Sequence, residues 1–168
     1  KTIPQCIVVC PMTTNVRVDY SPIINDTSET KNGGKMIAFF EKELIPYLKS
    51  NYKISKKIIW GQNYSGMFTT FILLTNPDLF DGYLSDIPQL GHLKKEIESD
   101  DCFNKIGNNK VFYQISWTTL EDKPIEMMNY LSKLESYSHN NLNWKYTEES
   151  DSIFITQILT NYTYGLNT

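Results

Sequence analysis

The sequence contains few of the residues from which metal and cofactor sites are built. Among its 168 residues are three cysteines and only two histidines, His92 and His139. Their spacing matches no zinc motif, and the single glycine pair, Gly33-Gly34, belongs to no phosphate-binding pattern. We therefore expect neither a metal nor a cofactor.

The chain also lacks a strong charge of either sign and a long apolar stretch. Its formal net charge is -3 and its pI about 5.4, so it has no basic field of the kind that drives nonspecific nucleic-acid binding. No apolar run approaches the roughly 18–20 residues of a membrane-spanning helix. We expect no nucleic acid and no membrane among its partners, and the sequence leaves its compartment open, cytoplasmic or exported.

The three cysteines do not form an obvious disulfide framework. Cys6 and Cys10 fall on one expected strand, where residues four apart are separated by about 13 Å, too far for a bridge. Together with Cys102 they make an odd number. We predict buried thiols, and the count does not require an oxidising compartment.

The chain has the composition of an ordinary globular protein, with 40% hydrophobic and 21% charged residues, and its length suits one domain over residues 1–168. Short apolar runs predict strands at 5–10, 56–60, 80–85, 110–116 and 142–147. Apolar residues at helical spacing predict helices at 35–52, kinked at Pro46, and at 66–75, 92–101, 123–137 and 153–166. This alternation favours an α/β fold with a mostly parallel sheet, in which chemistry takes place at the carboxyl ends of the strands.

Residues 57–71 read Lys-Ile-Ile-Trp-Gly-Gln-Asn-Tyr-Ser-Gly-Met-Phe-Thr-Thr-Phe, the outline of a nucleophile elbow. Such an elbow runs from a strand through a strained turn into a helix, and small residues on both sides of the nucleophile let its side chain project. Those flanking residues are Gly61 and Ser65, backed by Gly66, but the nucleophile position is Asn63. An amide has no nucleophilic oxygen for a base to activate, so ordinary acyl-serine chemistry is not expected.

Four stretches match a known family in order and spacing: Ile7–Cys10 with Asp19–Pro22, Phe40–Leu48, Trp60–Phe68 and Leu74–Tyr83. Through them the chain resembles the esterase D-like family of α/β-hydrolases, in the branch that includes siderophore-ester hydrolases. The resemblance implies an α/β-hydrolase-type three-layer sandwich with a mostly parallel sheet. Family members carry further strands upstream of the first one here, so we expect the family's N-terminal strands to be missing.

The family uses a Ser-acid-His triad in that chain order. By resemblance, the nucleophile position falls on Asn63 and the acid position on Glu121, with Asp122 beside it. The histidine position falls on Asp151, within a stretch from 147 to 153 that contains no histidine. Glu121 and Asp122 can be read in a second way, because acidic residues at the start of a helix interact favourably with the helix dipole. This structural role remains an alternative to the role of catalytic acid.

The resemblance further implies an oxyanion and ligand-binding set. One donor is the backbone N–H of Tyr64, and a second comes from the loop around Met12 or Thr13. Gln62 stands where the family commonly has an aromatic or basic residue, and Arg17 lies one position from the family's usual arginines. Both differences alter the inherited substrate pocket.

Few substitutes for the missing groups exist in the chain. His139 lies in a polar stretch typical of a solvated turn, whereas His92 follows a loop near the expected site and is an alternative base. Ser65 is the one alternative hydroxyl beside the elbow.

Loss of both nucleophile and base predicts a catalytically inactive pseudoenzyme that binds a small, ester-like molecule or a partner. In known serine hydrolases, removing triad members costs about 10⁴–10⁶ in rate. Two alternatives stay open: an active carboxylic-ester hydrolase in which a carboxylate such as Asp151 or Glu121 activates water, and an interaction module of a larger chain. The sequence does not indicate the oligomeric state.

Overall fold

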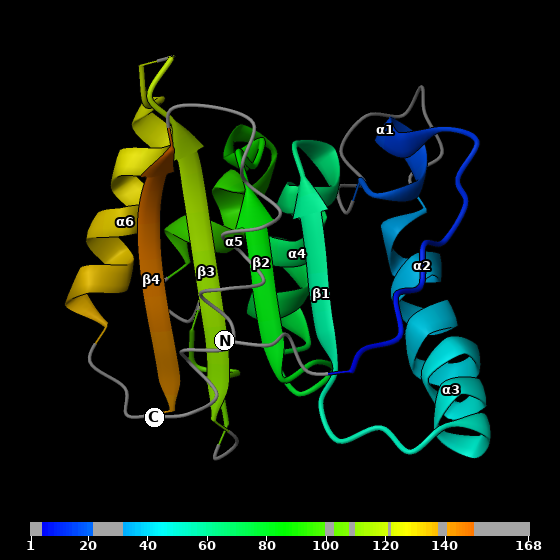
Figure 1. Cartoon of the computed structure of the whole chain (residues 1–168). Helices are drawn as coiled ribbons and strands as arrows, with labels where there is room; N and C mark the ends of the chain where they lie inside the picture. Colours follow the sequence, from blue (N-terminus) through cyan, green and yellow to red (C-terminus); the bar gives the residue numbers. More distant parts are fainter. Residues whose placement is uncertain are drawn as a thin grey trace.

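A parallel sheet of four strands forms the centre of the fold (Figure 1). The computed structural model describes residues 5–21, 32–99, 103–107, 110–120, 122–137 and 141–149. The strands are adjacent in sequence order: β1 (Ile58–Gln62), β2 (Gly82–Asp86), β3 (Val111–Thr118) and β4 (Leu142–Glu149). All three pairings are parallel, which confirms the predicted α/β class and four of the predicted strands, with small shifts at their ends.

The register brings the carboxyl ends of the strands together. Gln62 pairs with Asp86, Asp86 with Ser116, and Ser116 with Thr147. Side chains that follow these residues therefore meet at one edge of the sheet, where parallel α/β folds place their ligand sites.

The helices lie on one face of the sheet and beside its first strand. They are α1 (Val16–Asp19), α2 (Gly33–Phe39), α3 (Ile45–Asn51), α4 (Tyr64–Thr75), α5 (Lys94–Glu98) and α6 (Ile125–Ser136). The Tyr113 hydroxyl lies 3.1 Å from the Thr70 hydroxyl of α4, and its ring contacts Tyr130 of α6. Since one side chain of β3 touches both helices, α4 and α6 cover the same face, while α1, α2 and α3 stand next to β1 (Figure 1).

The core is built around α4. Met67, Phe68, Ile72 and Leu73 have almost no exposed surface, as the near-continuous apolar run predicts. The buried hydroxyl of Thr70 on α4 is paired, because it contacts the hydroxyls of Ser85 and Tyr113. Burial raises the pKa of Tyr113 to about 12. The helix predicted from residue 66 begins two residues earlier, at the elbow.

The helix predicted over 35–52 is continuous, but it widens before Pro46. A π-helical turn over Phe40–Leu44 joins α2 to α3, and the Ile45 N–H donates to the Phe40 carbonyl five residues back. Proline has no N–H for the carbonyl four residues earlier, and its ring pushes that carbonyl aside. The expected kink is thus accommodated as a π-helical turn.

The strand predicted at residues 5–10 is wrong. These residues are irregular, Val8 is 79% exposed, and Cys6 and Cys10 are exposed free thiols rather than buried ones. The run has the apolar composition of a buried strand, but no strand of the described sheet pairs with it. Burial on two faces requires neighbours, which composition alone does not provide.

The remaining expectations are met in part. The helix predicted over 92–101 is a 3-10 turn (Leu90–Leu93) followed by the short α5, and that predicted over 123–137 is α6. Cys102, His139 and the helix predicted over 153–166 lie outside the described residues. No helix in the described part is long and apolar enough to cross a membrane.

Replacing a fully buried α4 side chain should lower the stability of the whole fold. We expect Leu73→Ala to cost about 2–5 kcal/mol of unfolding free energy, because Leu73 is completely buried and its removal leaves a cavity. Leu120→Ala, at a position that is 72% exposed, should change it by less than about 0.5 kcal/mol. Urea unfolding followed by circular dichroism measures both, and equal losses would contradict this assignment of the core.

Candidate functional site

Asn63 occupies the strained turn of an elbow. Its backbone has φ 56° and ψ -115°, an uncommon conformation for a residue other than glycine. The Asn63 N–H donates to the Asp86 carbonyl at 2.9 Å, and the Asn63 carbonyl accepts from the Met67 N–H at 2.9 Å. Its side chain is exposed and makes no capping hydrogen bond to α4. The turn therefore projects an amide where a hydrolase would project a hydroxyl.

Two glycines make this turn possible. A Cβ atom on Gly61 would lie 2.3 Å from the carbonyl carbon and oxygen of Ser65. A Cβ on Gly66 would lie 2.7 Å from the Asp86 carbonyl oxygen and 2.9 Å from that of Gly61. The backbones of β1, β2 and α4 approach too closely for any side chain, so the predicted role of the small residues is supported by the packing.

Ser65 does not replace the missing nucleophile. Its hydroxyl donates to the Gln62 carbonyl at 2.8 Å and accepts from the Gln62 N–H at 3.0 Å. Both bonds hold the hydroxyl against the backbone of the turn. Gln62 itself is exposed at the carboxyl end of β1, beside Asn63.

Tyr64 brings two distant residues to the elbow. The guanidinium carbon of Arg17 lies 5.4 Å from the centroid of the Tyr64 ring, and the His92 ring lies 5.8 Å from it at an interplanar angle of 34°. Arg17 is the only arginine of the chain, and it forms no ion pair with the acidic residues that the structure describes. A cation and an imidazole therefore lie against the ring of the residue that follows the exposed Asn63 amide. Such groups are suited to binding an anionic or carbonyl group.

The loop predicted to supply the second oxyanion donor is tied to α1. Thr13 donates its hydroxyl to the Asp19 carboxylate, which also accepts from the Asn32 amide at 3.2 Å. These bonds hold the pKa of Asp19 below its usual range, and the bond from Thr13 has the largest effect. The Met12 side chain is 98% exposed. The role of either residue as an oxyanion donor stays a prediction.

The acid and histidine positions, Glu121 and Asp151, lie outside the described residues. At the carboxyl end of β4, Glu148 accepts hydrogen bonds from Lys123 and from the Tyr146 hydroxyl. These bonds lower the pKa of Glu148, and the bond from Lys123 has the largest effect. Lys123 also stacks over the Tyr146 ring.

Sequence reasoning missed Asp86. This carboxylate ends β2, is 1% exposed, and accepts from the Ser116 hydroxyl at 3.0 Å. Ile87, the next residue, has φ 42°, an outlier for a β-branched side chain. An acidic residue directly after an apolar strand was the available signal, because that position lies at the functional edge of a parallel sheet.

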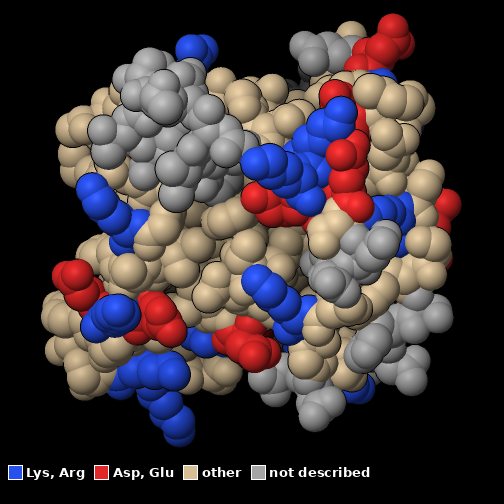
Figure 2. All heavy atoms as spheres, turned by 180° about the vertical axis from the view of Figure 1, so that it is seen from behind, with Lys and Arg blue, Asp and Glu red and all other residues tan. Residues whose placement is uncertain are grey.

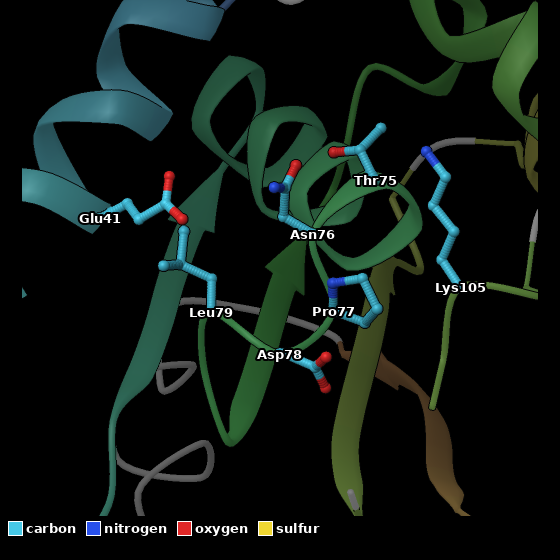
Figure 3. A pocket seen from close by; sticks show the side chains of 7 residues that line it. All are labelled: Glu41, Thr75, Asn76, Pro77, Asp78, Leu79 and Lys105. Atoms are coloured by element: carbon cyan, nitrogen blue, oxygen red, sulfur yellow. The ribbon is translucent and has the colours of Figure 1, made fainter. Parts of the chain in front are cut away.

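A hollow of the described surface lies away from the elbow. Figure 3 shows one of about 340 Å³ lined by Glu41, Lys105 and the segment from Thr75 to Leu79. That segment follows the carboxyl end of α4, so the hollow lies at the opposite end of the sheet from Asn63. On the face shown in Figure 2, basic and acidic side chains intermingle. Within the described ranges no group of three or more histidine, cysteine or acidic residues could hold a metal ion.

Comparison with known proteins finds a similar esterase. The ferri-bacillibactin esterase BesA of Bacillus subtilis is 28% identical over 109 residues, which are 62% of this chain and 34% of the esterase. The chain is a homologue of the esterase-family α/β-hydrolases. No family model matches this homologue.

Solved structures show the same fold. The BES protein from Bacillus cereus superposes with a TM-score of 0.71 at 21% identity, over 90% of this homologue and 62% of that chain. The siderophore hydrolase EstA from Aspergillus nidulans superposes with a TM-score of 0.65 at 17% identity, over 93% and 68%. These superpositions confirm the fold class. The sequence match to BesA supports the resemblance to siderophore-ester hydrolases. The homologue spans about a third of the curated relative, 34% of its length.

A methyl group at Gly66 should disrupt the elbow. Because its Cβ would meet two backbone carbonyls, we expect Gly66→Ala to cost about 1–3 kcal/mol or more of unfolding free energy. Gly91→Ala is the matched control, since no atom lies within 4 Å of a Cβ built there. Thermal unfolding of the two variants measures the difference, and an unchanged Gly66→Ala protein would contradict the close approach.

Proposed function

We propose that this esterase homologue is a catalytically inactive, ligand-binding pseudoenzyme. The observation that carries the proposal is Asn63 in the strained, exposed nucleophile position, with the neighbouring Ser65 hydroxyl bound to the backbone of the turn. By the resemblance, the position of the base also falls on an acidic residue, Asp151, instead of a histidine. Without a nucleophile and its base, only binding and oxyanion contributions remain.

The ligand is a small molecule with a carbonyl or hydroxyl group. The Asn63 amide offers two donors and an acceptor, and its exposed side chain lies beside the first N–H groups of α4. A carbonyl oxygen that a serine would attack is instead hydrogen-bonded here. An ester-like molecule can thus be held at the elbow without being cleaved.

The ligand also carries an anionic group. Arg17 is held over Tyr64 next to the elbow and has no ion pair among the described residues. A guanidinium binds a carboxylate through two parallel hydrogen bonds, which gives both affinity and orientation. Small carboxylates with a second oxygen-bearing group fit this pair of residues.

The unmodified protein should not hydrolyse esters. We expect no release of nitrophenol from short acyl-nitrophenyl esters above a heat-denatured control, because removal of triad members costs about 10⁴–10⁶ in rate. Asn63→Ser combined with Asp151→His should release nitrophenol measurably, whereas each single substitution should not. Turnover by the unmodified protein that survives Asn63→Ala would refute the pseudoenzyme and locate activity elsewhere.

Arg17 should confer a preference for anionic ligands. In titration calorimetry with short-chain carboxylates and their neutral methyl esters, we expect the carboxylates to bind more tightly, and Arg17→Gln to weaken them about tenfold, since a hydrogen bond to a charged group contributes about 1.5–3 kcal/mol. Lys49→Gln removes an exposed cation on α3 and should change nothing. Equal binding of acids and esters would argue against the role of Arg17.

A second candidate function is slow ester hydrolysis by water with His92 as the base. The observation that favours it is the contact between the His92 and Tyr64 rings beside Asn63. In that case any weak activity would be lost in His92→Gln and retained in Asn63→Ala, which separates this mechanism from the pseudoenzyme.

A further inference from the structure

A second hollow of the described surface lies at the amino ends of the first three strands. Its volume is about 310 Å³, and three lysines, Lys56, Lys57 and Lys110, line it together with Asp78, Phe80 and Asp81. These residues shortly precede β1, β2 and β3, which are neighbours in the sheet (Figure 1). The elbow follows the carboxyl end of β1, so the hollow and the elbow lie at opposite ends of the sheet.

The aspartates of this hollow do not cancel its positive charge. The Asp81 carboxylate accepts a hydrogen bond from the Lys57 backbone N–H at 2.8 Å and lies 3.4 Å from the Lys56 ammonium. This carboxylate is therefore already bound at the start of β1. Three ammonium groups beside two carboxylates leave one positive charge in excess.

Lys57 is the cation that would gain most from a bound anion. Its side chain is half-buried, and its ammonium donates to the Leu79 carbonyl at 2.7 Å, which uses one of its three donors on a neutral acceptor. Burial lowers the pKa of Lys57, because a charge that has lost part of its water is less stable. None of the ion pairs among the described residues involves Lys57 or the exposed Lys110.

The segment before β1 adds to this positive potential. Residues 35–57 contain six lysines and two glutamates, a formal charge of +4 within a chain whose net charge is -3. Lys49 of α3 lies close enough for its charge to lower the pKa of Lys57 as well. An anion in the hollow would relieve this repulsion, so the surroundings favour anions there.

We propose that this hollow binds a phosphate group, either free or carried by a small molecule as a phosphate monoester. A phosphate has several acceptor oxygens, so lysines on separate segments can each bind a different oxygen of one group. Phe80 offers an apolar wall to the organic part of a monoester. The site goes beyond the proposed function, because none of its residues belongs to the elbow.

Titration calorimetry with inorganic phosphate, at constant ionic strength, tests which lysines bind. We expect Lys57→Met and Lys110→Gln each to weaken binding about tenfold, because each removes a charged donor. Lys95→Gln removes an exposed cation of α5 outside the hollow and should leave the affinity unchanged, as should Arg17→Gln at the elbow. Circular dichroism checks that each variant keeps its fold.

Three results of this titration would overturn the proposal. Equal weakening by Lys95→Gln would mean nonspecific attraction, and weakening by Arg17→Gln alone would place the phosphate at the elbow. No binding of phosphate or of phenyl phosphate would exclude the site. Tighter binding of phenyl phosphate than of inorganic phosphate would support a monoester, and equal binding would support the free ion.

NMR of ¹³C-labelled lysine side chains tests the same site without any substitution. Saturating phosphate should raise the pKa of Lys57, because a nearby anion favours the charged ammonium. The Lys95 resonances should not move. An unchanged pKa of Lys57 would overturn the proposal, even if phosphate bound elsewhere on the protein.

Discussion

The hydrogen bond from the Asn63 N–H to the Asp86 carbonyl fixes the edge at which the candidate site lies. The same carbonyl approaches Gly66 so closely that a side chain there would overlap it. β1, β2 and the first turn of α4 are thus held by backbone contacts that do not involve the side chain of residue 63. The turn can keep its strained shape whatever that side chain is, which explains why the outline of a nucleophile elbow persists without a serine.

Local composition predicted the elements whose neighbours follow directly in the chain. The apolar run of α4 and the strand β3 are buried as expected, and Pro46 marked the place where the helix widens. Residues 5–10 show where this reasoning fails, because the burial of a strand depends on what pairs with it. Sequence alone could not place Arg17 and His92 against Tyr64, since their positions follow from the short helix α1 and from a 3-10 turn.

The proposed binding function is consistent with the charges around the elbow. A serine hydrolase needs a base that takes a proton and an acid that stabilises the resulting cation. The described residues place a neutral amide, Asn63, at the nucleophile position and a permanent cation, Arg17, over the ring of the next residue, Tyr64. Neither group can accept a proton at neutral pH, whereas both donate hydrogen bonds to oxygen. The buried Asp86 carboxylate is already bound to Ser116, so it stabilises the sheet edge.

β1 connects the elbow to the sheet. Its last residues, Gly61 and Gln62, enter the turn, while Ile58 and Trp60 precede them in the strand. The contact between Gly61 and Ser65 leaves no space for the strand to slide past α4. The same backbone contact therefore fixes both the register of β1 and the turn at Asn63.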